Sequence, residues 1–241
     1  MRITVINPNT TETMTAAIGQ IAKAHAAPST EITAMNPARG PVSIESFYDE
    51  YLAIPEVLKL VRQHDAESDA IVLACWGDPG IDAVREMTTK PVVGIAEASM
   101  YAANAIAPRW SVVTTLARSY HMVEHVVKKT GLGDRCASIR CVDMPVLDCD
   151  ENPDAVLQGL EQGGRLALQA DHAEAIILGC AGMGGMEAAL SQRLGVPCVD
   201  PVAAGVRFAE LLVGMQLTTS KRLTYRPPEP KLRKGMEDSQ D

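Results

Sequence analysis

Hydrophobic positions along the chain fall into short apolar runs separated by longer segments in which polar and apolar residues mix. The runs are rich in β-branched residues, whereas the segments between them have the length and polarity of surface helices. Continuous apolar runs of this length are typical of parallel strands that helices cover on both faces. We therefore predict an α/β fold with eight strands, at Ile3–Ile6, Glu31–Met35, Ala70–Ala74, Val92–Ile95, Ser111–Thr114, Ala137–Cys141, Ala175–Leu178 and Pro197–Val199.

Polar residues and prolines mark where the intervening helices begin. Thr10 or Thr11 can cap a helix that has Glu12 in its first turn, and Pro201 suits the first turn of another helix. For Thr10, capping is the favoured interpretation. Other helices are predicted to begin near Tyr48, Pro79, Glu97, Arg118, Pro153 and Met183.

The chain also repeats itself. Residues 69–87, DAIVLACWGDPGIDAVREM, align at a shift of 105 residues with 174–192, EAIILGCAGMGGMEAALSQ, in strand, cysteine, glycine-containing turn and helix. With one residue inserted, KPVVGIAEA aligns with VPCVDPVAA, and VINPNTT matches VVTTLAR more weakly. We predict two similar subdomains related by a pseudo-twofold, each with a parallel sheet of about four strands. Residues 1–96 plus 201–219 form the first subdomain, 97–200 form the second, and 220–241 form a loosely held tail.

The repeat places one cysteine, Cys75 or Cys180, at the carboxyl end of a strand in each half. Ligands of parallel sheets bind at that edge, so we expect the two thiols to face each other across a cleft. Each thiol precedes a predicted helix, whose N-terminal amides and dipole would lower the thiol pKa from about 8.5 toward neutrality. A single strand-end cysteine is usually a buried structural residue, but two at equivalent positions of a repeat favour a shared site.

Two opposed thiols suit the inversion of a stereocentre by proton transfer. A thiolate on one side removes a hydrogen from carbon, and a thiol on the other side delivers one to the opposite face. Backbone amides of the adjacent turns can stabilise the enolate oxygen that develops. This chemistry requires no metal and no redox cofactor, so none is predicted.

Composition and charge restrict the classes of molecule that the protein is expected to bind. A net charge of −8, from 22 basic and 30 acidic residues, argues against a nucleic-acid partner. No apolar run approaches the roughly 20 residues that span a bilayer, and the start of the chain lacks a signal-peptide pattern. We therefore expect a cytoplasmic protein with reduced cysteines that acts on a small molecule, without membrane contact. The basic residues of the tail are expected to be solvated: Lys221, Arg222, Arg226, Lys231, Arg233 and Lys234.

Other candidate sites are weaker. His121 and His125 are four residues apart on a predicted helix, but no HExxH motif accompanies them, so a solvated helix face is expected. GCAGMGG does not have the GxGxxG order of a dinucleotide-binding loop. Cys198 is expected in the core. No role is assigned to Cys136, Cys141 and Cys149. The remaining histidines, His25, His64 and His172, are interpreted as isolated or as lying on helical stretches away from the predicted strand ends.

Six motifs occur in order along the chain up to about Lys221: VINPNTTETMT, GPVSIESFYDE, ACWGDPG, PVVGIAEA, SVVTTLAR and ILGCAGM. Together they resemble the hydantoin racemase family, within the aspartate/glutamate racemase superfamily. The resemblance implies two α/β subdomains around a cleft, cofactor-free two-cysteine chemistry and a homo-oligomer. It places the catalytic cysteines at Cys75 and Cys180 and the substrate-binding turns at Asn7, Asn9, Pro41, Val42, Ser43, Gly77, Thr114, Thr115, Ala181 and Gly182.

The residues after the cysteines bear on the substrate. Amino-acid racemases of the superfamily have Cys-Asn-Thr and Cys-Thr-His patterns, where this chain has Cys-Trp-Gly at 75–77 and Cys-Ala-Gly at 180–182. This departure counts against free aspartate or glutamate. The uncharged turns suit a neutral heterocyclic amide, with a 5-substituted hydantoin as first choice and allantoin as the alternative. Trp76 either lines a pocket for an apolar 5-substituent of the ring or packs against the second half of the protein.

Several alternatives remain open at this point. Asn7, Asn9 and Thr114 can be helix caps instead of ligand-binding residues. Related folds support decarboxylation or cis-trans isomerisation through a cysteine. The chain can also be a non-catalytic small-molecule binding protein whose cysteines only line the site.

Overall fold

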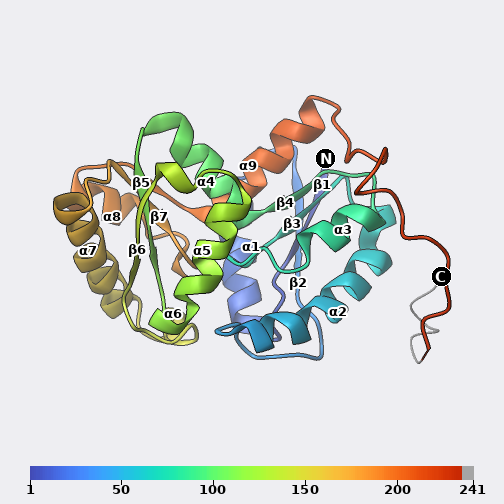
Figure 1. Cartoon of the computed structure of the whole chain (residues 1–241), viewed down its shortest axis with the longest axis horizontal. Coiled ribbons are helices and arrows are strands. Elements are labelled where there is room, and N and C mark those ends of the chain that lie inside the picture. The colour runs from blue at the N-terminus through green and yellow to red at the C-terminus, as the bar shows by residue number, and fades with distance from the viewer. Residues whose placement is uncertain (235–241) are drawn as a thin grey trace.

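The computed structural model describes residues 1–234 and has an α/β fold with two four-stranded parallel sheets side by side (Figure 1). The strand orders are β2-β1-β3-β4 and β6-β5-β7-β8, so each strand has a counterpart at the same position of the other sheet. All eight predicted strands are confirmed, with bounds that differ by at most one residue at either end. They are β1 (Arg2–Ile6), β2 (Glu31–Met35), β3 (Ala70–Leu73), β4 (Val92–Gly94), β5 (Trp110–Thr114), β6 (Cys136–Cys141), β7 (Ala175–Leu178) and β8 (Cys198–Val199).

Helices connect the strands and cover the sheets (Figure 1). The helices that follow the two cysteines begin later than predicted, because glycine-containing turns precede them. Gly80 adopts a left-handed φ of 72° directly before one helix, and Gly185, with φ 81°, precedes the other. The α-helices are α1 (Glu12–His25), α2 (Phe47–His64), α3 (Ile81–Met87), α4 (Ile95–Ile106), α5 (Tyr120–Lys129), α6 (Asp148–Glu151), α7 (Pro153–Ala170), α8 (Glu187–Leu194) and α9 (Pro201–Gly214).

Both sheets are buried on both faces, as their apolar strands require. Successive side chains of a strand point to opposite faces. In β1, Val5 therefore packs with α1 and α9, whereas Ile6 packs with α2 and α3. In β5, Val112 packs with α4 and α5, whereas Val113 packs with α7 and α8. No helix within residues 1–234 combines the length and apolar character needed to cross a membrane.

Helix α4 lies between the two halves. It begins directly after β4 of the first sheet and contacts both α9 and β7. Its residues Ile95 and Ala98 belong to the core of the first half, whereas Ala96 and Met100 belong to the core of the second half. The predicted boundary between residues 96 and 97 thus falls in the first turn of a shared helix, and the subdomain division stays a prediction.

The segment after α9 is attached to α3. The Lys221 ammonium donates hydrogen bonds to the backbone carbonyls of Arg85, Glu86 and Tyr225, and the Tyr225 hydroxyl donates to Asp82 at 3.0 Å. This attachment is closer than the composition of residues 220–241 led us to expect. The last residues of the expected tail, 235–241, lie outside the described part of the chain.

Candidate active site

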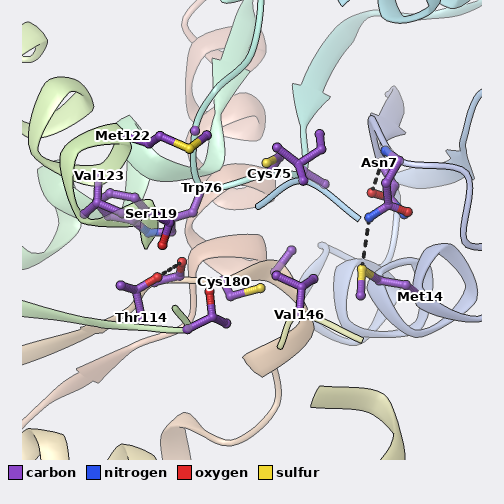
Figure 2. Close-up of a pocket in the computed structure, with 17 residues that line it drawn as sticks. Asn7, Met14, Cys75, Trp76, Thr114, Ser119, Met122, Val123, Val146 and Cys180 are labelled. Atoms are coloured by element: carbon purple, nitrogen blue, oxygen red, sulfur yellow. Dashed lines mark hydrogen bonds between the residues drawn. The ribbon is translucent and has the colours of Figure 1, made fainter. Parts of the chain in front are cut away.

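A cavity lies at the carboxyl ends of the strands, with walls from both halves. Cys75 enters it from the turn after β3 and Cys180 from the turn after β7, which are equivalent positions of the two sheets. Figure 2 shows the two side chains on facing walls of this cavity. The expectation that the repeat brings both thiols to one pocket is met by this arrangement.

Six of the predicted substrate-binding residues line the cavity, and all six are polar or small: Asn7, Asn9, Gly77, Thr114, Thr115 and Ala181. Ser119, Gly179 and Ala74 also line it, and the remaining wall is apolar: Met14, Ile44, Trp76, Met122, Val123 and Val146. No lining side chain among these described residues carries a charge. The cavity is therefore suited to a neutral ligand.

The thiol of Cys75 is partly buried, and its electrostatic environment disfavours the thiolate. Burial raises the pKa of Cys75 to about 12, and the nearby Cys180, Glu50 and Asp78 act in the same direction because a second negative charge is unfavourable. The backbone N–H of Gly77 donates to the sulfur and opposes this rise. In the ligand-free protein Cys75 is therefore a thiol at neutral pH.

The predicted lowering of the pKa by a helix N-terminus is wrong for Cys75. Helix α3 begins only at Ile81, six residues after the cysteine, and the one backbone N–H that lowers the Cys75 pKa is that of Gly77 in the turn. For Cys180 the element that follows is one short 3-10 turn, Ala181–Met183, and α8 begins at Glu187. For Cys180 the lowering of the pKa by a helix N-terminus stays a prediction.

Asn7 and Asn9 form a hydrogen-bonded pair at the end of β1. The Asn7 amide donates to Asn9 Oδ1 at 2.9 Å and to Thr15 Oγ1 at 3.0 Å, and Asn9 Oδ1 also accepts from the Thr11 backbone N–H. The Asn9 amide nitrogen lies 3.2 Å from Met14 Sδ, a contact drawn in Figure 2. The network holds both amides rigidly at the cavity wall.

The loop after β2 contains Pro41, Val42 and Ser43, which do not line the cavity. Instead, Pro41 and Val42 accept hydrogen bonds through their carbonyls from the hydroxyls of Thr10 and Thr11. Thr11 occupies the N-cap position of α1, as predicted, and Glu12 lies in the first turn, but no side-chain cap bond forms because the Thr11 hydroxyl bonds the loop instead. Capping by Thr10 is wrong, since its hydroxyl bonds the Pro41 carbonyl. The adjacent Ile44 does reach the cavity.

Thr114 and Gly179 bring the ends of β5 and β7 together. The Thr114 hydroxyl donates to the Gly179 carbonyl at 3.0 Å, and a Cβ at Gly179 would lie only 2.6 Å from Thr114 Cβ. Thr115 is buried beside it at the cavity wall. Gly182, also a predicted binding residue, lies behind Cys180 and does not line the cavity.

Trp76 satisfies both interpretations offered by the sequence. It is only 4% exposed and packs in the same core cluster as Met100 and Val123 of the second half, yet it also lines the cavity. Its indole nitrogen has no hydrogen-bond partner among the described residues. A buried N–H without a partner is unusual, and here it lies at the wall of a ligand-sized space.

Sequence reasoning missed much of the apolar wall. Met14, Met122 and Val123 lie on helices, and Val146 lies in a loop joined to the first half by a hydrogen bond from its backbone N–H to Glu45 Oε1 at 3.0 Å. None of these positions carries a local sequence signal, since apolar residues on helices are ordinarily core. Only the approach of the two halves brings them to the cavity.

Asp78, three residues after Cys75, is buried and has an unusual conformation. Its φ is 47°, and its carboxylate accepts the backbone N–H groups of Ala96 and Glu97 at 3.0 Å, capping α4. Burial, and then the charge of Glu97, raise the pKa of Asp78 to about 7. A Cβ on Gly94 would lie 2.1 Å from the Asp78 Cγ, so this turn fits only a glycine at position 94.

We expect Gly94→Ala to destabilise the protein by about 3 kcal/mol, because the new methyl group displaces the Asp78 cap and strains the packing around it. Thermal unfolding is expected to occur roughly 6–12 °C lower. Gly214→Ala is the matched control, since a Cβ there meets no atom within 4 Å. Equal thermal unfolding midpoints for Gly94→Ala and Gly214→Ala would contradict this expectation, because they would show that moving the Asp78 side chain does not destabilise the fold.

The fold and the cavity define a two-part α/β protein in which each half contributes one cysteine to a shared, uncharged pocket. A family model described as Asp/Glu/Hydantoin racemase matches residues 3–209. The chain belongs to this family.

Individual relatives are similar over nearly the whole chain. A hydantoin racemase of Pseudomonas sp. (strain NS671) is 50% identical over 232 residues, which cover 96% of this chain and 93% of the relative. Among solved structures, an allantoin racemase from Klebsiella pneumoniae is 40% identical with a TM-score of 0.96, covering 100% of this chain and 99% of that one. An allantoin racemase from Pseudomonas fluorescens is 42% identical with a TM-score of 0.94, covering 98% and 100%.

Proposed function

We propose that this protein racemises 5-substituted hydantoins by proton transfer between Cys75 and Cys180 through the C5 carbon of the ring. The observation that carries the proposal is the placement of these two thiols on facing walls of one cavity whose lining is uncharged. The 50% identity to a hydantoin racemase supports the choice of substrate.

The proposed reaction has two proton transfers. The thiolate of one cysteine takes the C5 proton, and the electron pair of the C–H bond moves into an enolate of the adjacent ring carbonyl. The thiol of the opposite cysteine then donates its proton to the other face of C5, and the electron pair returns to form the new C–H bond. One thiolate and one thiol are present before and after the reaction, so charge is conserved and the roles of the two cysteines exchange with substrate handedness.

The walls of the cavity supply groups for a neutral ring. Hydantoin presents ring carbonyls and N–H groups, which pair with amides, hydroxyls and backbone N–H groups. Asn9, Gly77, Thr114 and Thr115 line the cavity and carry such groups, whereas Asn7 already donates both amide hydrogens within the protein and positions Asn9. We propose that donors of this set stabilise the enolate oxygen in the transition state, when its charge develops.

Allantoin is the second candidate substrate, because two allantoin racemases of known structure have 40% and 42% identity to this chain. Single enantiomers of 5-benzylhydantoin, 5-isopropylhydantoin and allantoin separate the candidates when optical rotation is followed with purified protein. We expect rotation to fall to zero for the preferred substrate at least tenfold faster than for the others. Unchanged rotation with all three compounds would favour a non-catalytic binding protein.

The homo-oligomer implied by family membership belongs to the same proposal. Size-exclusion chromatography with light scattering measures the oligomeric state directly. We expect a mass of at least twice the 25.8 kDa of one chain, and a mass of 25.8 kDa would contradict the proposal.

A further inference from the structure

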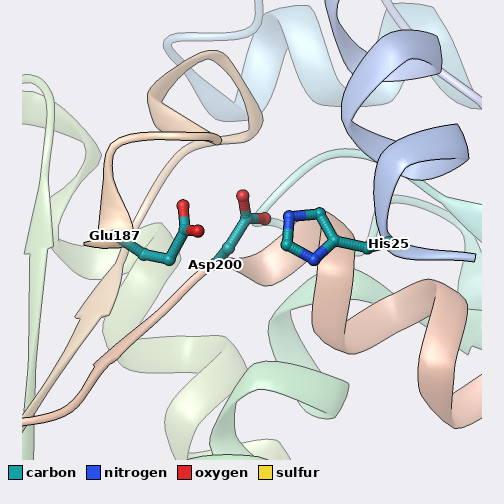
Figure 3. A group of neighbouring side chains, drawn as sticks. All are labelled: His25, Glu187 and Asp200. Atoms are coloured by element: carbon teal, nitrogen blue, oxygen red, sulfur yellow. The ribbon is translucent and has the colours of Figure 1, made fainter. Parts of the chain in front are cut away.

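Three side chains that could bind a metal ion meet on the side of the molecule where α1 approaches the second half. His25 is the last residue of α1, Glu187 the first residue of α8, and Asp200 the N-cap of α9. One ligand atom of each lies within 4.8 Å of those of the other two. Figure 3 shows the imidazole and both carboxyl groups directed toward a common space. His25 lies at the end of a helical stretch, as expected, and residues more than 160 positions away in the sequence fold against it.

Asp200 is held rigidly by the backbone. Its Oδ1 accepts from Val202 N at 2.7 Å and from Ala203 N at 3.0 Å, and its Oδ2 accepts from Gly185 N at 2.8 Å. These three N–H groups fix the plane of the carboxylate, and Oδ2, which accepts only one of them, keeps a lone pair for another partner. A ligand pre-oriented in this way loses little entropy on binding a cation.

Glu187 has an incomplete set of partners. Its Oε2 is shielded from solvent and has no hydrogen-bond partner among the described residues. A buried carboxylate oxygen without a partner is costly, so such an atom usually has a cation or an ordered water beside it. The unsatisfied oxygen belongs to the same group as His25 and Asp200, which supplies a reason for a cation to bind there.

The spacing leaves room for an ion. The ligand atoms of His25, Glu187 and Asp200 lie within 4.8 Å of one another, and among the described residues His25 forms no ion pair with either carboxylate. A transition-metal ion with bonds of about 2.1 Å joins ligands that are roughly 3–4 Å apart, so small side-chain rotations suffice to close the site. One imidazole and two carboxylates with open positions form a ligand set for divalent ions such as Mn²⁺ or Zn²⁺.

We propose that His25, Glu187 and Asp200 bind one divalent transition-metal ion that links the two halves of the protein. The ion fastens the end of α1 to the start of α8 and to the turn that follows Cys180, which Asp200 already holds through Gly185. The site is separate from the cavity, since none of its three residues lines that space. Its role is structural, and it takes no part in proton transfer.

Mn²⁺ is the probe for this proposal, because it prefers oxygen and imidazole ligands and the six cysteines compete poorly for it. Chelator-treated, untagged protein is titrated with Mn²⁺, and the loss of the free-ion electron paramagnetic resonance signal is measured. We expect one ion per chain, and at least tenfold weaker binding in His25→Ala and in Glu187→Gln, which keeps the shape of the side chain. His121→Ala is the matched control, since it removes an exposed histidine beside Glu124, and it should bind as the wild type does.

Thermal unfolding tests the link between the halves. With Mn²⁺ at about 100 times its dissociation constant, the midpoint of the wild type is expected to rise by roughly 5 °C, and the midpoints of the two site variants by less than 1 °C. Absence of Mn²⁺ binding to the wild type, or equal binding by both site variants, would overturn the proposal. Binding that leaves the wild-type midpoint unchanged would overturn the proposed structural role.

Discussion

The Cys75→Ala variant is expected to lose racemase activity by a factor of about 10²–10⁴, the usual contribution of a general acid or base. The proposed reaction needs a sulfur on each face of C5, and the cavity offers one from each half. Removal of Cys75 leaves Cys180 able to exchange the C5 hydrogen of one enantiomer without inverting it. Chiral chromatography measures the racemisation, and nuclear magnetic resonance in deuterium oxide measures the exchange for each enantiomer separately.

Two further variants, Cys180→Ala and Cys136→Ala, test whether the loss of activity is specific to the two cavity cysteines. Cys180→Ala should show the same loss with the opposite enantiomer exchanging, since the two thiols occupy facing walls. Cys136→Ala should keep wild-type activity, because this thiol is also partly buried, with a pKa raised to about 11 by burial, but lies in β6 away from the cavity. Full racemase activity in Cys75→Ala would rule out the two-base scheme.

The repeat made the pairing of the two cysteines predictable from sequence. Residues 69–87 and 174–192 are similar because each encodes a buried strand, a turn and a helix, and the structure places β3 and β7 at the same position of their sheets. Equivalent strand ends lie at equivalent edges, so Cys75 and Cys180 reach the same cavity once the halves pack together. Strand positions were predictable for a related reason: burial on both faces demands apolar runs that a sequence displays directly.

Features that depend on contact between distant segments were not predictable in this way. The threonine hydroxyls after β1 have a local use as helix caps, but the loop carbonyls of Pro41 and Val42 are better partners in the folded chain. His25 carries no sequence signal that links it to Glu187 or Asp200, because three separate elements bring them together. The cysteine environment was misjudged for the same reason: the length of the turn after Cys75 and the proximity of Glu50 are set by tertiary packing.

The raised pKa of Cys75 has a direct kinetic consequence. For the enantiomer whose C5 proton faces Cys75, the free enzyme needs the Cys75 thiolate to begin the reaction, and burial together with neighbouring negative groups keeps Cys75 protonated at neutral pH. Below its pKa, the fraction of a thiol present as thiolate increases tenfold for each pH unit. Since kcat/KM reports ionisations of the free enzyme, its pH dependence measures how strongly the cavity suppresses the thiolate.

For the enantiomer whose C5 proton Cys75 removes, we therefore expect kcat/KM to rise about tenfold per pH unit, and about 100-fold between pH 6 and pH 8, with no plateau near neutrality. Initial rates of racemisation at low substrate concentration, measured across this range, test the slope. Glu50→Gln removes a negative group that raises the pKa of Cys75, so its profile should shift to lower pH and its rate at pH 7 should increase. Glu56→Gln, on the same helix but not among the groups that act on Cys75, should leave the profile in place. A wild-type plateau beginning near pH 7 for this enantiomer would mean that the Cys75 thiolate is stabilised in the free enzyme, contrary to the effect of burial on this thiol.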